Sequence, residues 1–355
     1  MSSAYSKAEK ESGVGALVAA LRRSNAGAAS ALKARFLGVI VFLVLLLLLF
    51  SILTPRFLSA QNGTTILYTA AILAIAAVGQ TLVVLTGNLD LSVGSVMGLV
   101  AYIVYDLSGK FDAIGPFVIV LGLVIGVLAG AVNGFLVAVL DIPAIVATLG
   151  TMAIFRGITT VYSNGGQVTS GDIPGWMNAI ATGDIAGIPY YVLIALVVVI
   201  VVGIVLRVMP WGRRLYALGS NPKAARYFGL DSVRITFGAY IGSGVISAFA
   251  GLLLGAQVGT VSSQLANGYE MSVLAAVVVG GVSIWGGSGS VYGAAIGAVV
   301  LATIENGLVL LQVEDFYQLL IQGAAIVLAV SVDAIVQHRV SRATTRQRIL
   351  ESGVA

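Results

Sequence analysis

Long apolar segments separated by short polar ones constrain this chain more than any other feature. Of its 355 residues, 58% are hydrophobic and only 10% are charged, which is too little charge to cover the surface of a soluble domain. A helix needs about 20 apolar residues to cross a bilayer, and its backbone groups are then satisfied within the segment. The sequence therefore predicts an all-α polytopic membrane protein.

Ten segments are apolar enough to be drawn as spans. We predict them at residues 36–53, 64–86, 91–105, 117–140, 144–162, 190–207, 235–256, 269–284, 290–311 and 316–337. The third and eighth are short, so these two positions are the places where the count of ten is most open to change. The 36–337 region is predicted to be the membrane domain, and the polar 1–35 and 338–355 regions are predicted to be tails.

Positive charge predicts how these spans are oriented. Cationic loops stay on the cytosolic side of a membrane. Both tails are rich in Lys and Arg, and the polar 209–234 segment has six cations in or beside it: Arg207, Arg213, Arg214, Lys223, Arg226 and Arg234. The 163–188 segment has none. We therefore expect both termini and 209–234 to be cytosolic and 163–188 to be external. The net charge of +4 follows from this distribution and does not indicate nucleic-acid binding.

The 209–234 segment also has the signals of a folded element. Asn221-Pro222 is a turn or helix-start signal, residues 224–228 are predicted to form a short helix, and Gly229 is placed to end it. A short helix held at the cytosolic face is suited to docking a soluble partner. The alternative is a plain connecting loop whose charge only sets its orientation.

Two sequence echoes link the halves of the chain. Residues 90–93 match 270–273, and Asn-Gly at 133–134 and 306–307 begins two stretches with the same internal spacing. The predicted orientations of the third to fifth spans and of the eighth to tenth are opposite. That is the pattern of a 5+5 inverted repeat, and transport paths often lie between such repeats. Short echoes also arise by chance in an apolar chain.

Polar residues inside the predicted spans, or in the break between the second and third, are the candidates for a solute path, because such residues are costly in a membrane without a role. They are Asn88, Asp90, Ser92, Asn133, Glu270, Ser272, Glu305 and Asn306. Each has a plainer explanation. Asp90 and Glu270 are placed to cap two half-length helices, and Asn133 and Asn306 to join helices by hydrogen bonds. Arg156 has the plain explanation of reaching the interface with its long side chain.

The residues offer no route to covalent chemistry. The chain has no cysteine and a single histidine, His338, so neither a zinc site nor a Ser-His-Asp triad is expected. The glycine-rich 280–289 segment lacks the lysine of a phosphate-binding loop. We predict a transport protein that is not an enzyme and that binds no cofactor or metal itself.

Three ordered segments resemble the permease subunit of bacterial ABC importers for monosaccharides, the family of the ribose, xylose, arabinose and galactose permeases. These are GNLDLSVGS at 87–95, GRRLYALGSNPKAARYFGL at 212–230, and YEMSVLAAVVVGGVSIWGGSGSVYGAAIGA at 269–298. Branched-chain amino-acid permeases are more distantly similar. The sequence departs from the family pattern at Asn88, at Met271-Ser272 and at Trp285, which puts the solute preference in doubt more than the family.

The resemblance implies a fold like that of type II importers and alternating access for a pentose or hexose at the bacterial inner membrane. It implies a tandem-domain ATPase that uses ATP and Mg²⁺, a sugar-binding protein outside, and a second permease, either an identical copy in a homodimer or a paralogue. Carried onto this chain, the coupling residues are Ala217, Gly219, Asn221, Pro222, Ala225, Arg226 and Gly229.

Other functions stay open on the sequence alone. The same type of permease could carry autoinducer-2, a nucleoside or a branched-chain amino acid. A proton-coupled secondary transporter would use Asp90 and Glu270 as proton carriers, and the repeat pattern permits it. An enzyme embedded in the membrane fits least, because no nucleophile and base can be paired.

Overall fold

The computed structural model describes residues 37–314, together with 317, 319–321, 323, 324, 327 and 331. Both predicted tails, most of the predicted span 316–337 and His338 lie outside the described residues.

The described chain is mostly helical, which agrees with the predicted polytopic helical class. A helix at Leu37–Leu53 comes first. It is followed by α2 (Ala60–Leu85), α3 (Val93–Lys110), the 3-10 helix η1 (Asp112–Phe117), α4 (Val118–Gly134), the π-helical turn η2 (Phe135–Val139), α5 (Ala144–Ser163), α6 (Gly175–Thr182), the hairpin β1 (Asp184–Ile185) and β2 (Ile188–Pro189), α7 (Tyr190–Val208), α8 (Pro210–Ser220), α9 (Pro222–Tyr227), α10 (Ser232–Val258), α11 (Tyr269–Val279) and α12 (Val291–Leu310).

Among the described residues, six stretches are long and apolar enough to cross a membrane. They are α2, the continuous run Asp112–Val139, α5, α7, α10 and α12. The Leu37–Leu53 helix and α11 are apolar but shorter. The chain is therefore a multi-pass membrane protein.

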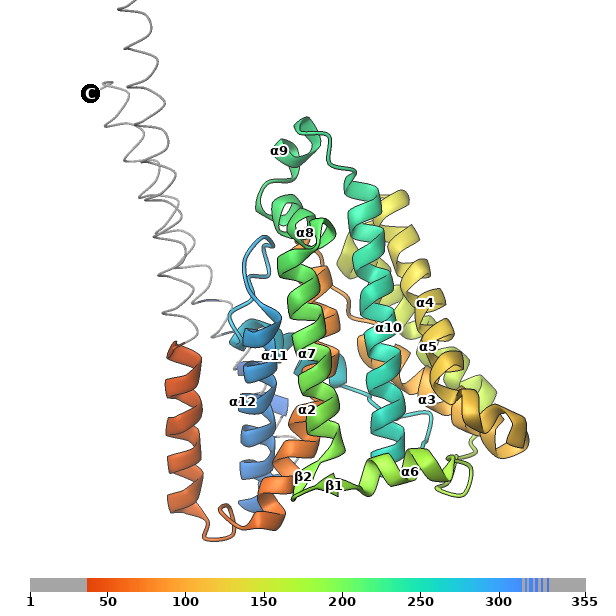
Figure 1. The fold of residues 1–355 in the computed structure, drawn as a ribbon, viewed down its shortest axis with the longest axis vertical. Helices are drawn as coiled ribbons and strands as arrows, with labels where there is room; N and C mark the ends of the chain where they lie inside the picture. The colour runs from red at the N-terminus through yellow and green to blue at the C-terminus, as the bar shows by residue number, and fades with distance from the viewer. Residues whose placement is uncertain are drawn as a thin grey trace, which may run out of the picture.

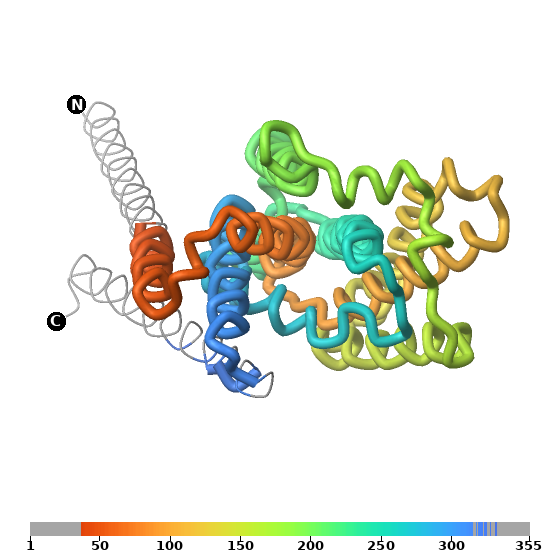
Figure 2. Tube along the Cα trace, turned by 90° about the horizontal axis from the view of Figure 1, so that it is seen from below, coloured from red at the N-terminus to blue at the C-terminus, as the bar shows by residue number. Residues whose placement is uncertain are grey.

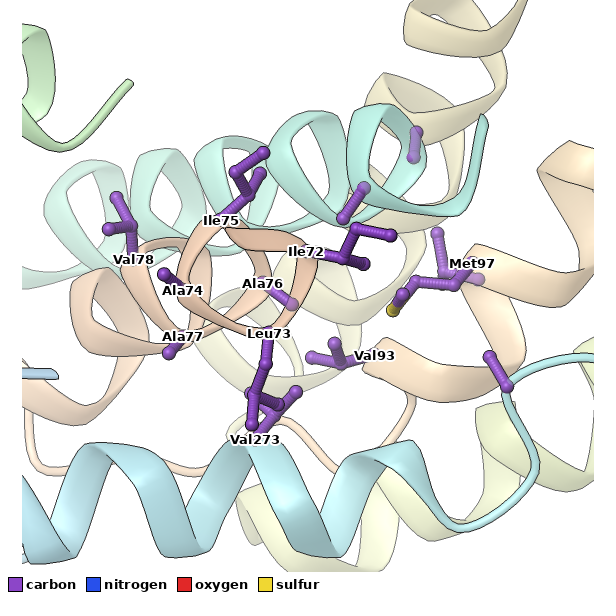
Figure 3. Close-up of a cluster of buried hydrophobic side chains, with 14 of the residues drawn as sticks. Ile72, Leu73, Ala74, Ile75, Ala76, Ala77, Val78, Val93, Met97 and Val273 are labelled. Atoms are coloured by element: carbon purple, nitrogen blue, oxygen red, sulfur yellow. The ribbon is translucent and has the colours of Figure 1, made fainter. Parts of the chain in front are cut away.

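Two helices, α2 and α10, lie side by side at the centre of the bundle (Figure 2). Helix α2 also packs against α7, α11 and α12, and α10 packs against α3 and α4. The middle of α2, from Ile72 to Val78, is buried on every side, and Val93, Met97 and Val273 come from α3 and α11 to meet it (Figure 3). A helix that is apolar all round is suited to such a central place.

The two short predicted spans need correction at their ends. The predicted span 269–284 ends as a helix at Val279, because the chain turns at Gly280 and Gly281, where Gly281 has a positive φ of 83°. Its 11 residues make a helix about 16 Å long, half of a bilayer core. Helix α3 begins at Val93 and continues past the predicted end at 105 to Lys110, whose ammonium pairs with Asp106 at 2.8 Å one turn earlier.

Two polar segments contain more structure than the sequence predicted. The short helix predicted at 224–228 is confirmed as α9, but the preceding residues, interpreted as a loop, form the 11-residue helix α8. Helix α8 starts with Pro210 at its first turn and buries Leu215 and Leu218. The 163–188 segment contains α6 and most of the β1–β2 hairpin. Figure 1 shows α8 and α9 at one end of the bundle and α6, β1 and β2 at the other.

Candidate functional site

The break between α2 and α3 places a carboxylate at the centre of the bundle. Asp90 is only 3% exposed. Its Oδ1 accepts hydrogen bonds from the backbone N (3.0 Å) and the Oγ (2.7 Å) of Ser92, and its Oδ2 accepts one from Ser243 Oγ on α10 (3.1 Å). The hydroxyl of Tyr240, also on α10, donates to the carbonyl of Leu89 (2.9 Å). The non-helical segment before α3 is therefore fixed to α10.

Three more helices contribute to the same cluster. Asn133 of α4 donates through Nδ2 to Ser92 Oγ (2.7 Å) and lies 3.5 Å from Asp90 Oδ1. Thr151 of α5 donates to Asn133 Oδ1 (2.6 Å). The amide of Gln80 on α2, oriented to match its neighbours, donates to the Asp90 carbonyl (3.1 Å) and accepts from the Asp90 N (3.2 Å). We call Gln80, Asp90, Ser92, Asn133, Thr151 and Ser243 the Asp90 cluster.

Of the four predicted path residues in the first half of the chain, the Asp90 cluster brings three together and leaves one out. Asp90, Ser92 and Asn133 meet, whereas Asn88 donates instead to Thr86 Oγ1 (2.9 Å) at the end of α2. Asp90 accepts from the residue two positions later, and the N-cap residue Ser92 makes no capping hydrogen bond of its own. The carboxylate thus organises the turn before the helix and has its oxygens bonded to protein groups. A buried, fully bonded polar group of this kind holds elements in one arrangement.

Among the described residues, the corresponding residues of the second half make separate contacts. Ser272 of α11 donates to Glu305 Oε1 of α12 (3.3 Å), and Asn306 donates to Asn62 Oδ1 of α2 (2.8 Å). Glu270 lies in the first turn of α11 with Oε2 against Gly94 of α3, where a Cβ would collide with it. Among the described residues this buried oxygen has no hydrogen-bond donor. Asn306 therefore does not repeat the contact that Asn133 makes.

Helix α8 packs directly onto two breaks in the bundle. A Cβ on Gly219 would collide with the carbonyl of Leu85, the last residue of α2, and would lie 2.5 Å from the Gly287 N. The Gly287 N in turn donates to that same Leu85 carbonyl (3.0 Å). The turn between α11 and α12 and the end of α2 therefore meet beneath α8. Only glycine allows this approach.

Two hydroxyls of α8 fix it further to the same turn. Tyr216 donates to the carbonyl of Gly289 (3.1 Å), and Ser220 to that of Gly287 (3.3 Å). Burial raises the pKa of Tyr216, so its phenol is a neutral donor at physiological pH. A displacement of α8 must therefore move this turn or break these contacts.

Helix α9 is formed by the residues that the sequence singled out. Asn221 caps it by accepting from the Ala224 N (2.9 Å), Pro222 is its first residue, and Gly229, with φ of 75°, follows its end. Ala225 is buried, whereas Ala217, Pro222 and Arg226 are exposed. Gly219 is also buried, so it is not part of the surface that a partner would meet.

Two aromatic residues at the end of α9 were not among the predicted site residues. Tyr227, the last residue of α9, is 92% exposed, and Phe228, which follows it, is 86% exposed. Helix α9 itself lies at one end of the bundle (Figure 1). Two adjacent aromatics in an otherwise polar segment were the available signal. Exposed aromatic side chains that no other part of the described chain covers are typical of a contact surface.

At the opposite end, two polar segments far apart in sequence are joined. Val168, in the segment after α5, and Val261, in the segment between α10 and α11, form a bridge with two backbone hydrogen bonds of 2.9 Å each. The 163–188 and 257–268 segments therefore form one connected surface beside α6.

A multi-pass helical bundle in which non-helical segments meet a buried polar cluster, with the short helices α8 and α9 at one end, is the arrangement expected of a membrane transport subunit. A family model described as "branched-chain amino acid transport system / permease component" matches residues 62–330. The chain belongs to this family of ABC importer permeases. Members of this family are transport components and not enzymes.

Individual import permeases are similar to this chain over most of its length. The chain is 36% identical to a ribose import permease protein, RbsC, of Bacillus subtilis over 298 residues, covering 84% of this chain and 92% of the relative. It is 36% identical to RbsC of Escherichia coli strain K12, covering 83% and 92%. It is 35% identical to an autoinducer 2 import system permease protein, LsrC, of Escherichia coli, covering 88% and 91%. No solved structure matches.

Proposed function

We propose that this chain is the membrane-spanning subunit of an ATP-driven, binding-protein-dependent importer that moves a pentose or hexose across the bacterial inner membrane by alternating access. The observation that carries the proposal is the contact of α8 with the end of α2 and with the α11–α12 turn. Through this contact, a movement of the exposed helix α9 and of α8 would reach the end of α2 and the α11–α12 turn. The end of α2 leads directly into the segment that contains Asp90. The similarity to ribose permeases supports a monosaccharide as the solute.

A tandem-domain ATPase is the partner proposed for α9. The exposed Tyr227 and Phe228 supply apolar contact area, and Lys223 and Arg226 surround them with positive charge. ATP and Mg²⁺ would be held by that partner. Closure of the ATPase would push α9, and α8 would transmit the push through Gly219 to Leu85 and Gly287. The spans around the path would then change their packing.

The opposite end is proposed to face outward and to receive a sugar-binding protein. The concentration of cations around α8 and α9 favours the cytosol for that end. The outer surface would be the connected 163–188 and 257–268 segments. A second permease, an identical copy or a paralogue, would lie beside this chain and complete the path.

The packing of the bundle supports the proposed ten-span, 5+5 inverted repeat. Helix α2 packs against α12 and α11, and α10 packs against α4 and α3. Exchanging α2 with α10, α3 with α11 and α4 with α12 turns the first set of contacts into the second. Under this repeat, three second-half residues are proposed to lie beside the path: Glu270, Ser272 and Glu305. Their side chains are less buried than those of the Asp90 cluster.

Tyr227→Ala with Phe228→Ala tests the docking role. Both side chains are almost fully exposed, so their loss should leave the permease folded while the ATPase no longer co-purifies and ATP-dependent uptake falls to background. Phe117→Ala is the matched control, because Phe117 is also exposed (62%) but lies in η1 at the other end. Unchanged ATPase capture and uptake in the double variant would contradict the proposal. So would uptake that stops when the proton gradient is collapsed while ATP is maintained.

Autoinducer-2 is the second candidate solute, favoured by the 35% identity to the LsrC relative. The two candidates differ in the binding protein that accompanies the complex. Mass spectrometry of the ligand released by the co-purified binding protein distinguishes a pentose or hexose from the autoinducer.

A further inference from the structure

The guanidinium of Arg156 bonds inside the bundle, although the sequence predicted only that its long side chain reaches the membrane interface. Arg156 is in the second half of α5, well before the helix ends at Ser163. Its Nη1 donates to the carbonyls of Leu265 (2.8 Å) and Ser263 (3.2 Å) in the segment that precedes α11. The side chain therefore bonds a distant backbone segment. A cation at such a depth is costly unless it has partners and a role.

The same segment rests on the backbone of α3. A Cβ on Gly98 would lie 2.6 Å from the Leu265 carbonyl and 3.1 Å from Arg156 Nη1. A Cβ on Gly94 would lie 2.6 Å from the Ala266 carbonyl and would collide with Glu270 Oε2. Two glycines one turn apart thus provide the flat surface on which the 259–268 segment closes. Arg156 holds that segment from the side of α5.

Glu270 provides a third acceptor near this guanidinium. Its Oε2 lies against Gly94 and Arg156 Nη1 lies against Gly98, one turn further along α3, so the carboxylate and the guanidinium face the same side of that helix. Glu270 Oε2 is buried and accepts no hydrogen bond within the described chain, which is a costly state for a carboxylate oxygen. A guanidinium has five N–H donors, and its bonds to the Leu265 and Ser263 carbonyls use Nη1 alone. The guanidinium therefore has two carbonyl acceptors in use and a nearby carboxylate oxygen that accepts no hydrogen bond within the described chain.

We propose that Arg156 is a positioning residue that holds the 259–268 segment closed over the start of α11, and that it transfers to Glu270 Oε2 when the segment lifts. The transfer exchanges two carbonyl acceptors for one carboxylate, so the buried charge keeps a partner throughout. The bridge between Val261 and Val168 connects the moving segment to the surface beside α6. As a consequence that rests on the proposed function, a docking partner at that surface could lift the segment and open the outer side of the path.

Cysteine labelling of the full chain measures this closure directly, because the natural sequence contains no cysteine. Ala266→Cys places a thiol at a buried position of the 259–268 segment. Its rate of reaction with a membrane-impermeant maleimide, in right-side-out vesicles, reports how often the segment lifts. Adding Arg156→Gln should raise this rate about tenfold or more, as expected for the loss of a charge-assisted hydrogen bond. Arg156→Lys, which keeps the charge, should restore most of the closure.

Glu270→Gln gives the result that a merely structural role would not give. Removing the counter-ion of the lifted state should slow Ala266→Cys labelling, by up to about fivefold for a partly solvated ion pair. Equal labelling in Arg156→Gln and its parent, or faster labelling in Glu270→Gln, would overturn the proposal.

Two further cysteine variants are controls for the accessibility of the segment and for the folding of the chain. Asn267→Cys is exposed in the closed state and should label equally in all backgrounds, and Ala250→Cys in α10 is buried and should stay unlabelled in every folded variant. If Ala266→Cys and Asn267→Cys label only in inverted vesicles, with the same ratios, the proposed orientation fails while the role of Arg156 stands. Neither ATP nor a partner enters the measurement, so it is independent of the importer proposal.

Discussion

The starts of α3 and α11 occupy matching positions in the sequence but differ in how they are held. Each helix is preceded by a non-helical segment and has an acidic residue near its first turn. Asp90 receives hydrogen bonds from its own segment, from α4 and from α10, and both of its oxygens are used. Glu270 has one oxygen without a donor among the described residues, pressed against Gly94.

This difference separates a fixed point from a movable one. Fully bonded polar networks make one arrangement rigid, whereas a buried acceptor without a donor favours any rearrangement that supplies one. We infer that the first half of the bundle provides the frame and that the start of α11 is the part that changes partners. Membership of a repeat therefore does not give two matching carboxylates the same role.

The largest expected effect is the loss of the Asp90 carboxylate. Asp90→Ala leaves the Ser92 N, the Ser92 Oγ and the Ser243 Oγ without the acceptor that they have inside the bundle. It should lower the free energy of unfolding by about 3 kcal/mol, since breaking a buried network costs more than a single neutral hydrogen bond. Thermal unfolding of the detergent-solubilised chain measures this.

Glu270→Ala is the comparison for that loss. It removes an oxygen that already lacks a donor, so it should cost less than about 1 kcal/mol. Equal destabilisation by Asp90→Ala and Glu270→Ala would contradict the view that the start of α3 is fixed and the start of α11 is movable.

An intermediate effect is expected where the two starts touch. In Gly94→Ala, the new methyl group would collide with Glu270 Oε2 and lie 2.6 Å from the Ala266 carbonyl, so α3 and the 259–268 segment must separate. We expect a loss of about 1–3 kcal/mol, the usual range for overpacking. Gly157→Ala is the control, because its Cβ would meet no atom within 4 Å and alanine favours the helix by about 1 kcal/mol. A stable Gly94→Ala variant would show that the two starts do not need this close contact.

The sequence could predict the class of fold because the apolar composition and the spacing of polar segments are local properties. It also predicted short apolar segments where α3 and α11 lie, without their correct ends, and a short helix at 224–228 that the structure has at Pro222–Tyr227. It could not pair Asp90 with Ser243, which is 153 residues away, because that contact depends on how α2 and α10 pack. The burial of Gly219 and the hydrogen bonds of Arg156 could not be predicted from the sequence for the same reason. Both depend on segments brought together only in the folded bundle.

The smallest expected effects come from the hydroxyls of the two halves. Thr151→Val keeps the shape of the side chain but leaves Asn133 Oδ1 without the hydrogen bond that it accepts at 2.6 Å in a closed cluster, so it should cost about 1 kcal/mol. Ser272→Ala removes a longer bond, 3.3 Å, to a glutamate at the less enclosed start of α11 and should cost about 0.5 kcal/mol.

The ratio of the stability losses in Thr151→Val and Ser272→Ala tests whether the difference between the starts of α3 and α11 extends to their hydroxyl groups. Equilibrium unfolding of both variants, beside Thr160→Val as an exposed control on α5, measures them under one set of conditions. A larger loss for Ser272→Ala than for Thr151→Val would mean that α11 is held through Glu305 rather than left free. The movable part of the bundle would then have to be confined to the 259–268 segment and Arg156.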